Sequence, residues 1–169
     1  IWAGSSRRVE NAIAPVLDAL QTVPSFVYII PVVMLFTVGA VPGIIASVLY
    51  AIVPGIRLTA LGIRQVPTET VEAATAYGAT RAQSLFGVRI PLAAPTIMAG
   101  VNQVIMMVLA MIIIAGLVGS GALGFETVRV VKRSMTGLGF EVAIAVVTMA
   151  IILDRLTQSW AEKLQPPTA

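Results

Sequence analysis

The stretch ALQTVPSFVYIIPVVMLFTVGAVPGIIASVLYAIVPGI, residues 19–56, contains no charged side chain. It is almost twice as long as the roughly 20 residues that cross a bilayer once as a helix. Two crossings are therefore predicted, with the break at TVGAVPG, residues 37–43, where Gly and Pro interrupt the apolar run. This break gives one helix over about 12–37 and a second over about 43–60.

A second uncharged run, residues 90–125, follows a short polar segment. It predicts a third helix over about 92–116, and a fourth follows over about 139–157. Because only helices and closed barrels satisfy their backbone groups in lipid, apolar runs of this length indicate helices. The predicted fold is all-α, a polytopic membrane helical bundle with about four transmembrane helices.

Composition supports a membrane protein and argues against an enzyme. Hydrophobic residues make up 57% of the chain and charged residues only 11%, with a mean hydropathy of +0.93, whereas soluble domains carry about 25% charged residues. The sequence has no Cys and no His, which removes disulfides, thiolate metal ligands and the commonest general base. No catalytic residue and no metal site are predicted, and the scattered basic residues do not indicate nucleic-acid binding.

The opening residues Ile1–Gly4 include neither an initiator Met nor a signal-peptide pattern. They resemble the end of a further helix. We therefore expect a chain that lacks its amino-terminal part.

The distribution of Lys and Arg predicts the orientation of the bundle. One set of loops holds Arg7, Arg8, Arg57, Arg64, Arg81, Arg89, Arg155 and Lys163. The opposite set holds only Arg129, Lys132 and Arg133. By the positive-inside rule the first set is cytoplasmic, so the polar segment of residues 64–91 is predicted to be a cytoplasmic loop.

Within this loop the sequence predicts two short helices. Thr68 is expected to cap the first helix, and Gly78 to end it. Thr80 and Gln83 have the spacing of a capping box and open a second helix, which runs toward Gly87 and ends before the next span. The first helix carries several Ala side chains, which let another protein approach its backbone closely.

The loop resembles a known family. Glu72-Ala73-Ala74, Gly78, Val88 and Ile90-Pro91 are close to the EAA-x3-G-x9-I-x-L-P signature of ABC importer permeases, with Val for Ile and Ile for Leu as apolar departures. The resemblance implies that the loop docks on a cytoplasmic ATPase subunit. The residues implied in this interface are Glu72, Ala73, Ala74, Tyr77, Gly78, Arg81 and Leu85. An ordinary helical hairpin with Ala chosen for helix propensity is the alternative.

Three further stretches, residues 17–36, 91–103 and 152–158, resemble permease subunits of glycine betaine/proline betaine importers. Across 1–169 the resemblance implies a permease transmembrane domain with a methionine-importer-like fold, in a bacterial inner membrane, serving osmoprotection. It also implies a second permease copy, an external substrate-binding protein and ATPase subunits. The ATPase subunits would bind ATP and Mg, so this chain would need no cofactor.

Asn102 and Gln103 are polar residues within the third predicted span. An unsatisfied amide is costly in hydrocarbon, so at least one should face protein or water. They could line the translocation path or form hydrogen bonds between helices. Arg57 is expected to reach the cytoplasmic interface at the end of the second span, and Asp154 the interface at the inner end of the fourth.

Gly119 to Gly124 match the G-x-G-x-x-G pattern of dinucleotide sites. That motif requires a strand before it and a helix after it, whereas here an apolar helix precedes it. A flexible outer loop or a re-entrant bend is the preferred interpretation.

Three functions are compatible with these features. The first is an ABC importer permease for betaines or for another small solute such as an amino acid, choline or carnitine. The second is an ion-coupled secondary transporter, which usually needs a charged residue near the bilayer midplane, and the two uncharged runs contain none. The third is a helical scaffold without transport activity.

Overall fold

The structure is a computed structural model that describes residues 7–163. The helices are α2 (Arg7–Thr22), η1 (Ser25–Tyr28), α3 (Ile29–Phe36), α4 (Ala40–Arg64), α5 (Thr68–Ala76), α6 (Arg81–Ser84), η2 (Leu85–Arg89), α7 (Ile90–Gly116), α8 (Ala122–Lys132) and α9 (Thr136–Lys163). The described range contains no strand, which confirms the all-α prediction. The expectation for Ile1–Gly4 lies outside the described residues.

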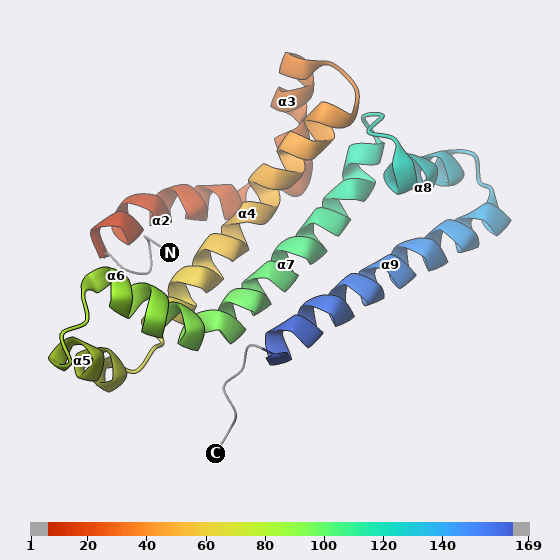
Figure 1. Cartoon of the computed structure of the whole chain (residues 1–169). Helices are drawn as coiled ribbons and strands as arrows, with labels where there is room; N and C mark the ends of the chain where they lie inside the picture. Colours follow the sequence, from red (N-terminus) through yellow and green to blue (C-terminus); the bar gives the residue numbers. More distant parts are fainter. Residues whose placement is uncertain (1–6, 164–169) are drawn as a thin grey trace.

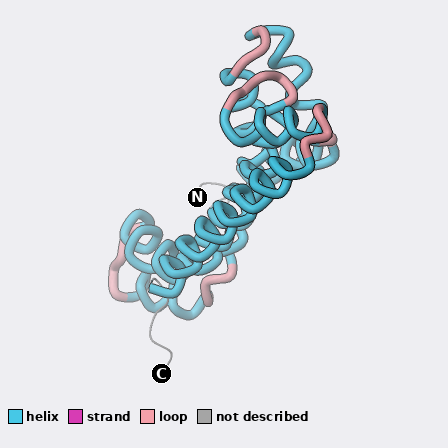
Figure 2. The backbone as a smooth tube through the Cα atoms, turned by 90° about the vertical axis from the view of Figure 1, so that its right-hand side faces the viewer, coloured by secondary structure: helices cyan, strands magenta, loops and turns pink. Residues whose placement is uncertain are grey.

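Within residues 7–163, three helices are long and apolar enough to cross a membrane: α4, the continuous helix from α6 to α7, and α9. Their axes are similarly inclined although the chain direction alternates from one to the next, and α5 and α6 lie at the opposite end of the molecule from α3 and α8 (Figure 1). Turned by 90°, the loops gather at the two ends of a column of helices (Figure 2). The number of spans rises to four if the bent pair of α2 with η1 and α3 counts as one.

This bent pair corrects the first predicted helix. Residues 12–37 do not form one helix, because α2 and the following helical segment meet at 106°. Pro24 has an extended backbone, with ψ at 138°, and its ring leaves no N–H to continue a helical ladder. The chain restarts as the 3-10 turn η1, in which the Val27 N–H donates to the Pro24 carbonyl at 2.8 Å.

Small residues bring α4 and α7 together, the most extensively packed pair of helices. A Cβ added at Gly100 would lie 3.0 Å from the Leu58 Cβ and 3.8 Å from the Gly55 Cα. Close backbone approach is how membrane helices gain packing energy, since lipid tails remove any hydrophobic drive between them. A buried cluster that includes Tyr28 and Met111 continues this contact toward α3.

The segment after α7 contains the predicted bend and an unpredicted helix. Gly119 and Gly121 have φ of +73° and +78°, a conformation that glycine adopts at no steric cost. The helix α8 then packs back on α7 so closely that a Cβ on Gly124 would lie 2.0 Å from the Ile112 carbonyl oxygen. The three glycines therefore form a turn and a helix contact, and no strand precedes them.

The helix α9 lies against α7 and α8 and has no buried residue of its own. It begins at Thr136 and ends at Lys163, whereas the predicted span covered only 139–157. The extra residues, 136–138 and 158–163, are mixed in polarity, and apolar patterning alone therefore did not predict them.

Candidate functional site

The polar loop forms two short helices at the end of the bundle where α9 ends (Figure 1). No residue of α5 is buried. Thr68 was expected to cap α5 but is its first helical residue, and Pro67 occupies the cap position without a side-chain hydrogen bond. Glu69 in the first turn compensates the helix dipole in its place.

Gly78 ends α5 as predicted. Its φ of +83° is in the left-handed region. Its N–H donates to the Thr75 carbonyl at 2.9 Å, and the Ala79 N–H donates to the Ala74 carbonyl at 3.0 Å. This pair of bonds is a Schellman motif, and it fixes the angle at which the chain enters the next helix.

The capping box of α6 is confirmed. The Gln83 N–H donates to the Thr80 Oγ1 at 3.3 Å, and the Thr80 N–H donates to the Gln83 Oε1 at 2.9 Å. The prediction that this helix ends before Pro91 is wrong, because α6, η2 and α7 form one continuous helix. The wider π turn of η2, in which the Ile90 N–H donates to the Leu85 carbonyl, precedes the proline, and such turns absorb a break in the helical ladder.

The predicted interface residues occupy two faces of this helix pair. On α5 and its turn, Glu72, Ala73 and Gly78 are exposed, Ala74 is half-buried, and Tyr77 is 94% exposed. Arg81 and Leu85 instead line a groove of about 430 Å³ between α5 and the α6–η2 helix.

Several groove residues were missed by the sequence analysis. Arg89 and Ser84 line the groove beside Arg81 and Leu85, and Val71 of α5 lines it from the other helix. The spacing of Arg81, Leu85 and Arg89 by four residues places them on one helix face. That spacing was a usable signal, but it was hidden by the expectation of a helix break.

Asn102 forms hydrogen bonds between helices. Its Nδ2 donates to the Asp154 Oδ1 at 2.8 Å, and its Oδ1 accepts from the Thr157 Oγ1 at 2.8 Å. The Gln158 Nε2 donates to the other Asp154 oxygen at 2.7 Å. These bonds satisfy the Asn102 amide within the protein. Gln103 is exposed, and a place on the translocation path stays a prediction for both residues.

Asp154 was expected at the inner end of its helix. It lies before that end, because α9 continues to Lys163. The hydrogen bonds from Asn102 and Gln158 supply the carboxylate with donors, and a carboxylate so bonded can be accommodated within a membrane helix. Asp154 therefore joins α9 to α7.

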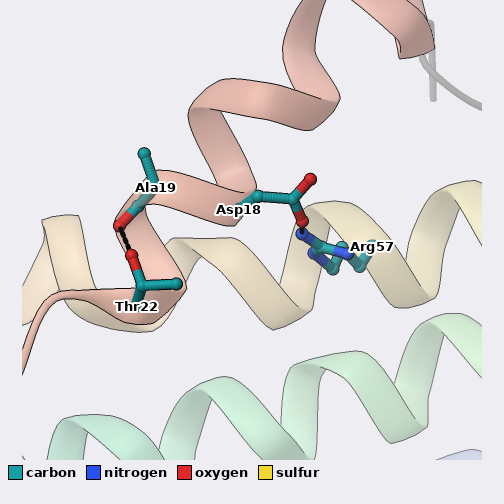
Figure 3. Close-up of polar contacts among 4 residues, drawn as sticks. All are labelled: Asp18, Ala19, Thr22 and Arg57. Atoms are coloured by element: carbon teal, nitrogen blue, oxygen red, sulfur yellow. Dashed lines mark hydrogen bonds and ion pairs between the residues drawn. The ribbon is translucent and has the colours of Figure 1, made fainter.

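Arg57 pairs with Asp18 of α2 (Figure 3). The expectation that Arg57 reaches the cytoplasmic interface did not include this partner. Arg64 forms a second ion pair with Glu10, about two turns further along the contact between the two helices. Neither pair was predicted, because the partners are 39 and 54 positions apart in the chain. Within residues 7–163, no group of three or more acidic side chains could hold a metal ion.

Comparison with known proteins gives concordant results. The family described as binding-protein-dependent transport system inner membrane component matches residues 1–166. The glycine betaine transport system permease protein OpuAB of Bacillus subtilis is 49% identical over 94% of this chain and 56% of its own length. The glycine betaine/proline betaine transport system permease protein ProW of Escherichia coli is 49% identical over 94% of this chain and 45% of its own length. The chain thus spans about half the length of these relatives.

An inward-facing structure of the MetNI methionine ABC transporter has a similar fold, with a TM-score of 0.83 at 16% identity. The similarity covers 95% of this chain and 78% of that one, and it agrees with the methionine-importer-like fold implied by the sequence. The chain belongs to the family of binding-protein-dependent transport system inner membrane components.

Proposed function

We propose that this chain is the permease of an ATP-driven importer for glycine betaine and proline betaine, and that residues 64–91 are its coupling loop. The observation that carries the proposal is the exposed helix pair α5–α6. It holds the Glu72-Ala73-Ala74 and Gly78 motif at one end of the bundle, and its second helix continues into the span α7.

The continuous helix provides a mechanical path. A force applied at α6 is transmitted along η2 and α7 without an intervening loop. The partners in this proposal are a cytoplasmic ATP-binding subunit, a second permease copy, an extracytoplasmic substrate-binding protein and the lipid bilayer. Hydrolysis belongs to the ATP-binding subunit, and this chain is not an enzyme.

Similarity to OpuAB and ProW supports betaines as the substrates. Aromatic residues, which form cation–π cages for quaternary ammonium groups, make up only 6% of this chain. We therefore assign primary selectivity to the substrate-binding protein. Uptake of radiolabelled glycine betaine, in cells lacking other betaine uptake systems, should depend on this gene, and excess unlabelled choline, carnitine or an amino acid should compete less than glycine betaine. Stronger competition by one of these solutes would reassign the substrate.

The docking proposal is tested with a single cysteine, because the chain has none. The variant Ala76→Cys places a thiol on an exposed position of α5. In the full-length protein in native membranes, a short thiol cross-linker should capture the ATPase subunit, identified by mass spectrometry. The matched control Ser134→Cys is exposed at the opposite end of the bundle and should capture none.

If the Ala76→Cys thiol reacts with a small reagent yet captures no ATPase subunit, with or without ATP, the coupling loop is contradicted. The scaffold function then gains support.

A further inference from the structure

The groove between α5 and the α6–η2 helix is lined by two positively charged side chains with an apolar residue between them. Arg81 and Arg89 lie on one face with Leu85 between them. The two arginines are eight positions apart on this helix. Val71 and Thr75 of α5 line the opposite wall, and none of the lining residues is acidic.

Neither groove arginine is neutralised within the part of the chain that the structure describes. The ion pairs in residues 7–163 are Asp18–Arg57, Glu10–Arg64 and Glu126–Arg129. A guanidinium presents a planar set of donors that matches a carboxylate. Two such groups without an anion make the groove attractive to acidic side chains.

The middle of the groove is apolar. Leu85 is half-buried, and Phe86 lines the groove and is 66% exposed. A large exposed aromatic beside charged residues is typical of the centre of a protein interface. A lipid headgroup would also match the arginines, but one wall of the groove is α5, which carries the Glu72-Ala73-Ala74 motif.

We infer that the groove binds a segment of the ATPase subunit in which two carboxylates flank an apolar side chain. One carboxylate contacts Arg81 and the other contacts Arg89. The apolar side chain packs on Leu85 and Phe86. This inference rests on the proposed docking of an ATPase subunit, and it adds the chemistry of the segment that docks.

The test uses a zero-length carbodiimide, which joins a lysine amine to a carboxylate as an amide. The printed sequence has lysines only at positions 132 and 163, so Arg81→Lys or Arg89→Lys introduces the sole amine of this loop. Each variant, in the full-length permease in native membranes with its partners, should form an amide with an Asp or Glu of the ATPase subunit. The two linked acids should lie within a few residues of one another, with an apolar residue between them.

The control Arg64→Lys lies beside its own partner Glu10 and should give an amide within the permease chain. If Arg64→Lys reacts and Ala76→Cys captures the ATPase subunit, but neither groove lysine links to it, the groove inference fails while docking stands. Linkage of a groove lysine to the carboxylate of a serine-containing lipid also overturns it. Failure of Ala76→Cys to capture the ATPase subunit contradicts the proposed function itself.

A second measurement uses neutral variants. Replacing both Arg81 and Arg89 by Gln should reduce the fraction of permease that copurifies with the ATPase subunit by about tenfold, a loss equivalent to about 1.4 kcal/mol. Replacing Arg64 by Gln, outside the groove, should leave that fraction unchanged. Equal losses in both variants would contradict a specific role for the groove.

Discussion

Gly78 shows how one residue sets the shape of the coupling loop. A Cβ added there would meet no atom within 4 Å, so the only obstacle to a side chain is the φ of +83°. The left-handed conformation costs a non-glycine residue about 1–2 kcal/mol. We expect Gly78→Ala to weaken the Schellman turn and lower copurification of the ATPase subunit while the spans still fold.

Gly87 provides the matched control for this prediction. It also has open space around its Cβ position, but it has no positive φ. Gly87→Ala should therefore leave copurification unchanged. Equal behaviour of the two variants would mean that the turn conformation does not matter for docking.

At this scale local chemistry was predictable and distant partners were not. The stop at Gly78 and the Thr80–Gln83 capping box depend on residues within one turn of the chain, and both were predicted. Asn102 was recognised as needing a partner, but Asp154 lies 52 positions away. A single sequence gives the cost of an unpaired amide and does not say where its partner is.

At the scale of helices, the Asn102–Asp154 contact joins α7, which continues from the coupling loop, to α9. Asn102→Asp would place two carboxylates against each other, and like charges in contact are unfavourable. We expect it to destabilise the protein by more than about 1 kcal/mol, the size of a strong hydrogen bond between membrane helices. Thermal unfolding of the protein in detergent measures the loss.

Adding Asp154→Asn to that variant should restore most of the lost stability. The double variant exchanges the two groups, so one carboxylate and one amide still face each other. Thr157 can still donate to a side-chain oxygen at position 102, and Gln158 can still donate to one at position 154. Gln103→Glu is the control. It adds a carboxylate at the neighbouring position, whose side chain forms no hydrogen bond with Asp154, so Asp154→Asn should not rescue it. Rescue of both variants, or of neither, would contradict a specific contact.

The glycine contact between α7 and α8 makes a second prediction for helices. A Cβ on Gly124 would lie 2.0 Å from the Ile112 carbonyl oxygen, so Gly124→Ala must displace α8. Overpacking of this kind costs about 1–3 kcal/mol or more. Gly137→Ala, in open space on α9, should not destabilise the protein, because Ala favours helix over Gly by up to about 1 kcal/mol. A comparison of the two melting temperatures is the measurement.

The spans themselves were predictable because long apolar runs have few alternatives in a membrane. The bend at Pro24 and the helix α8 were not predicted, for different reasons. The apolar run continues on both sides of Pro24, and membrane helices often tolerate proline. The helix α8 is mixed in polarity and depends on its close contact with α7, which no local pattern reports.

For the whole molecule, the two ends of the bundle carry different numbers of basic residues. The end with α5, α6 and the last turns of α9 holds Arg64, Arg81, Arg89, Arg155 and Lys163, and the end with α8 holds Arg129, Lys132 and Arg133. By the positive-inside rule, the larger set of basic residues marks the cytoplasmic side. Position 76 should therefore face the cytoplasm and position 134 the outside, which is the arrangement that docking of a cytoplasmic ATPase requires.

A membrane-impermeant thiol reagent, applied to spheroplasts so that no outer membrane shields the protein, tests this topology. It should label Ser134→Cys strongly and Ala76→Cys only after the membrane is permeabilised, since both positions are exposed on the protein. Reaction of both variants with a membrane-permeant reagent controls for burial. The reverse pattern would place the Glu72-Ala73-Ala74 loop outside, where no ATPase subunit could reach it, and would leave α5 and α6 as an external surface with a different partner.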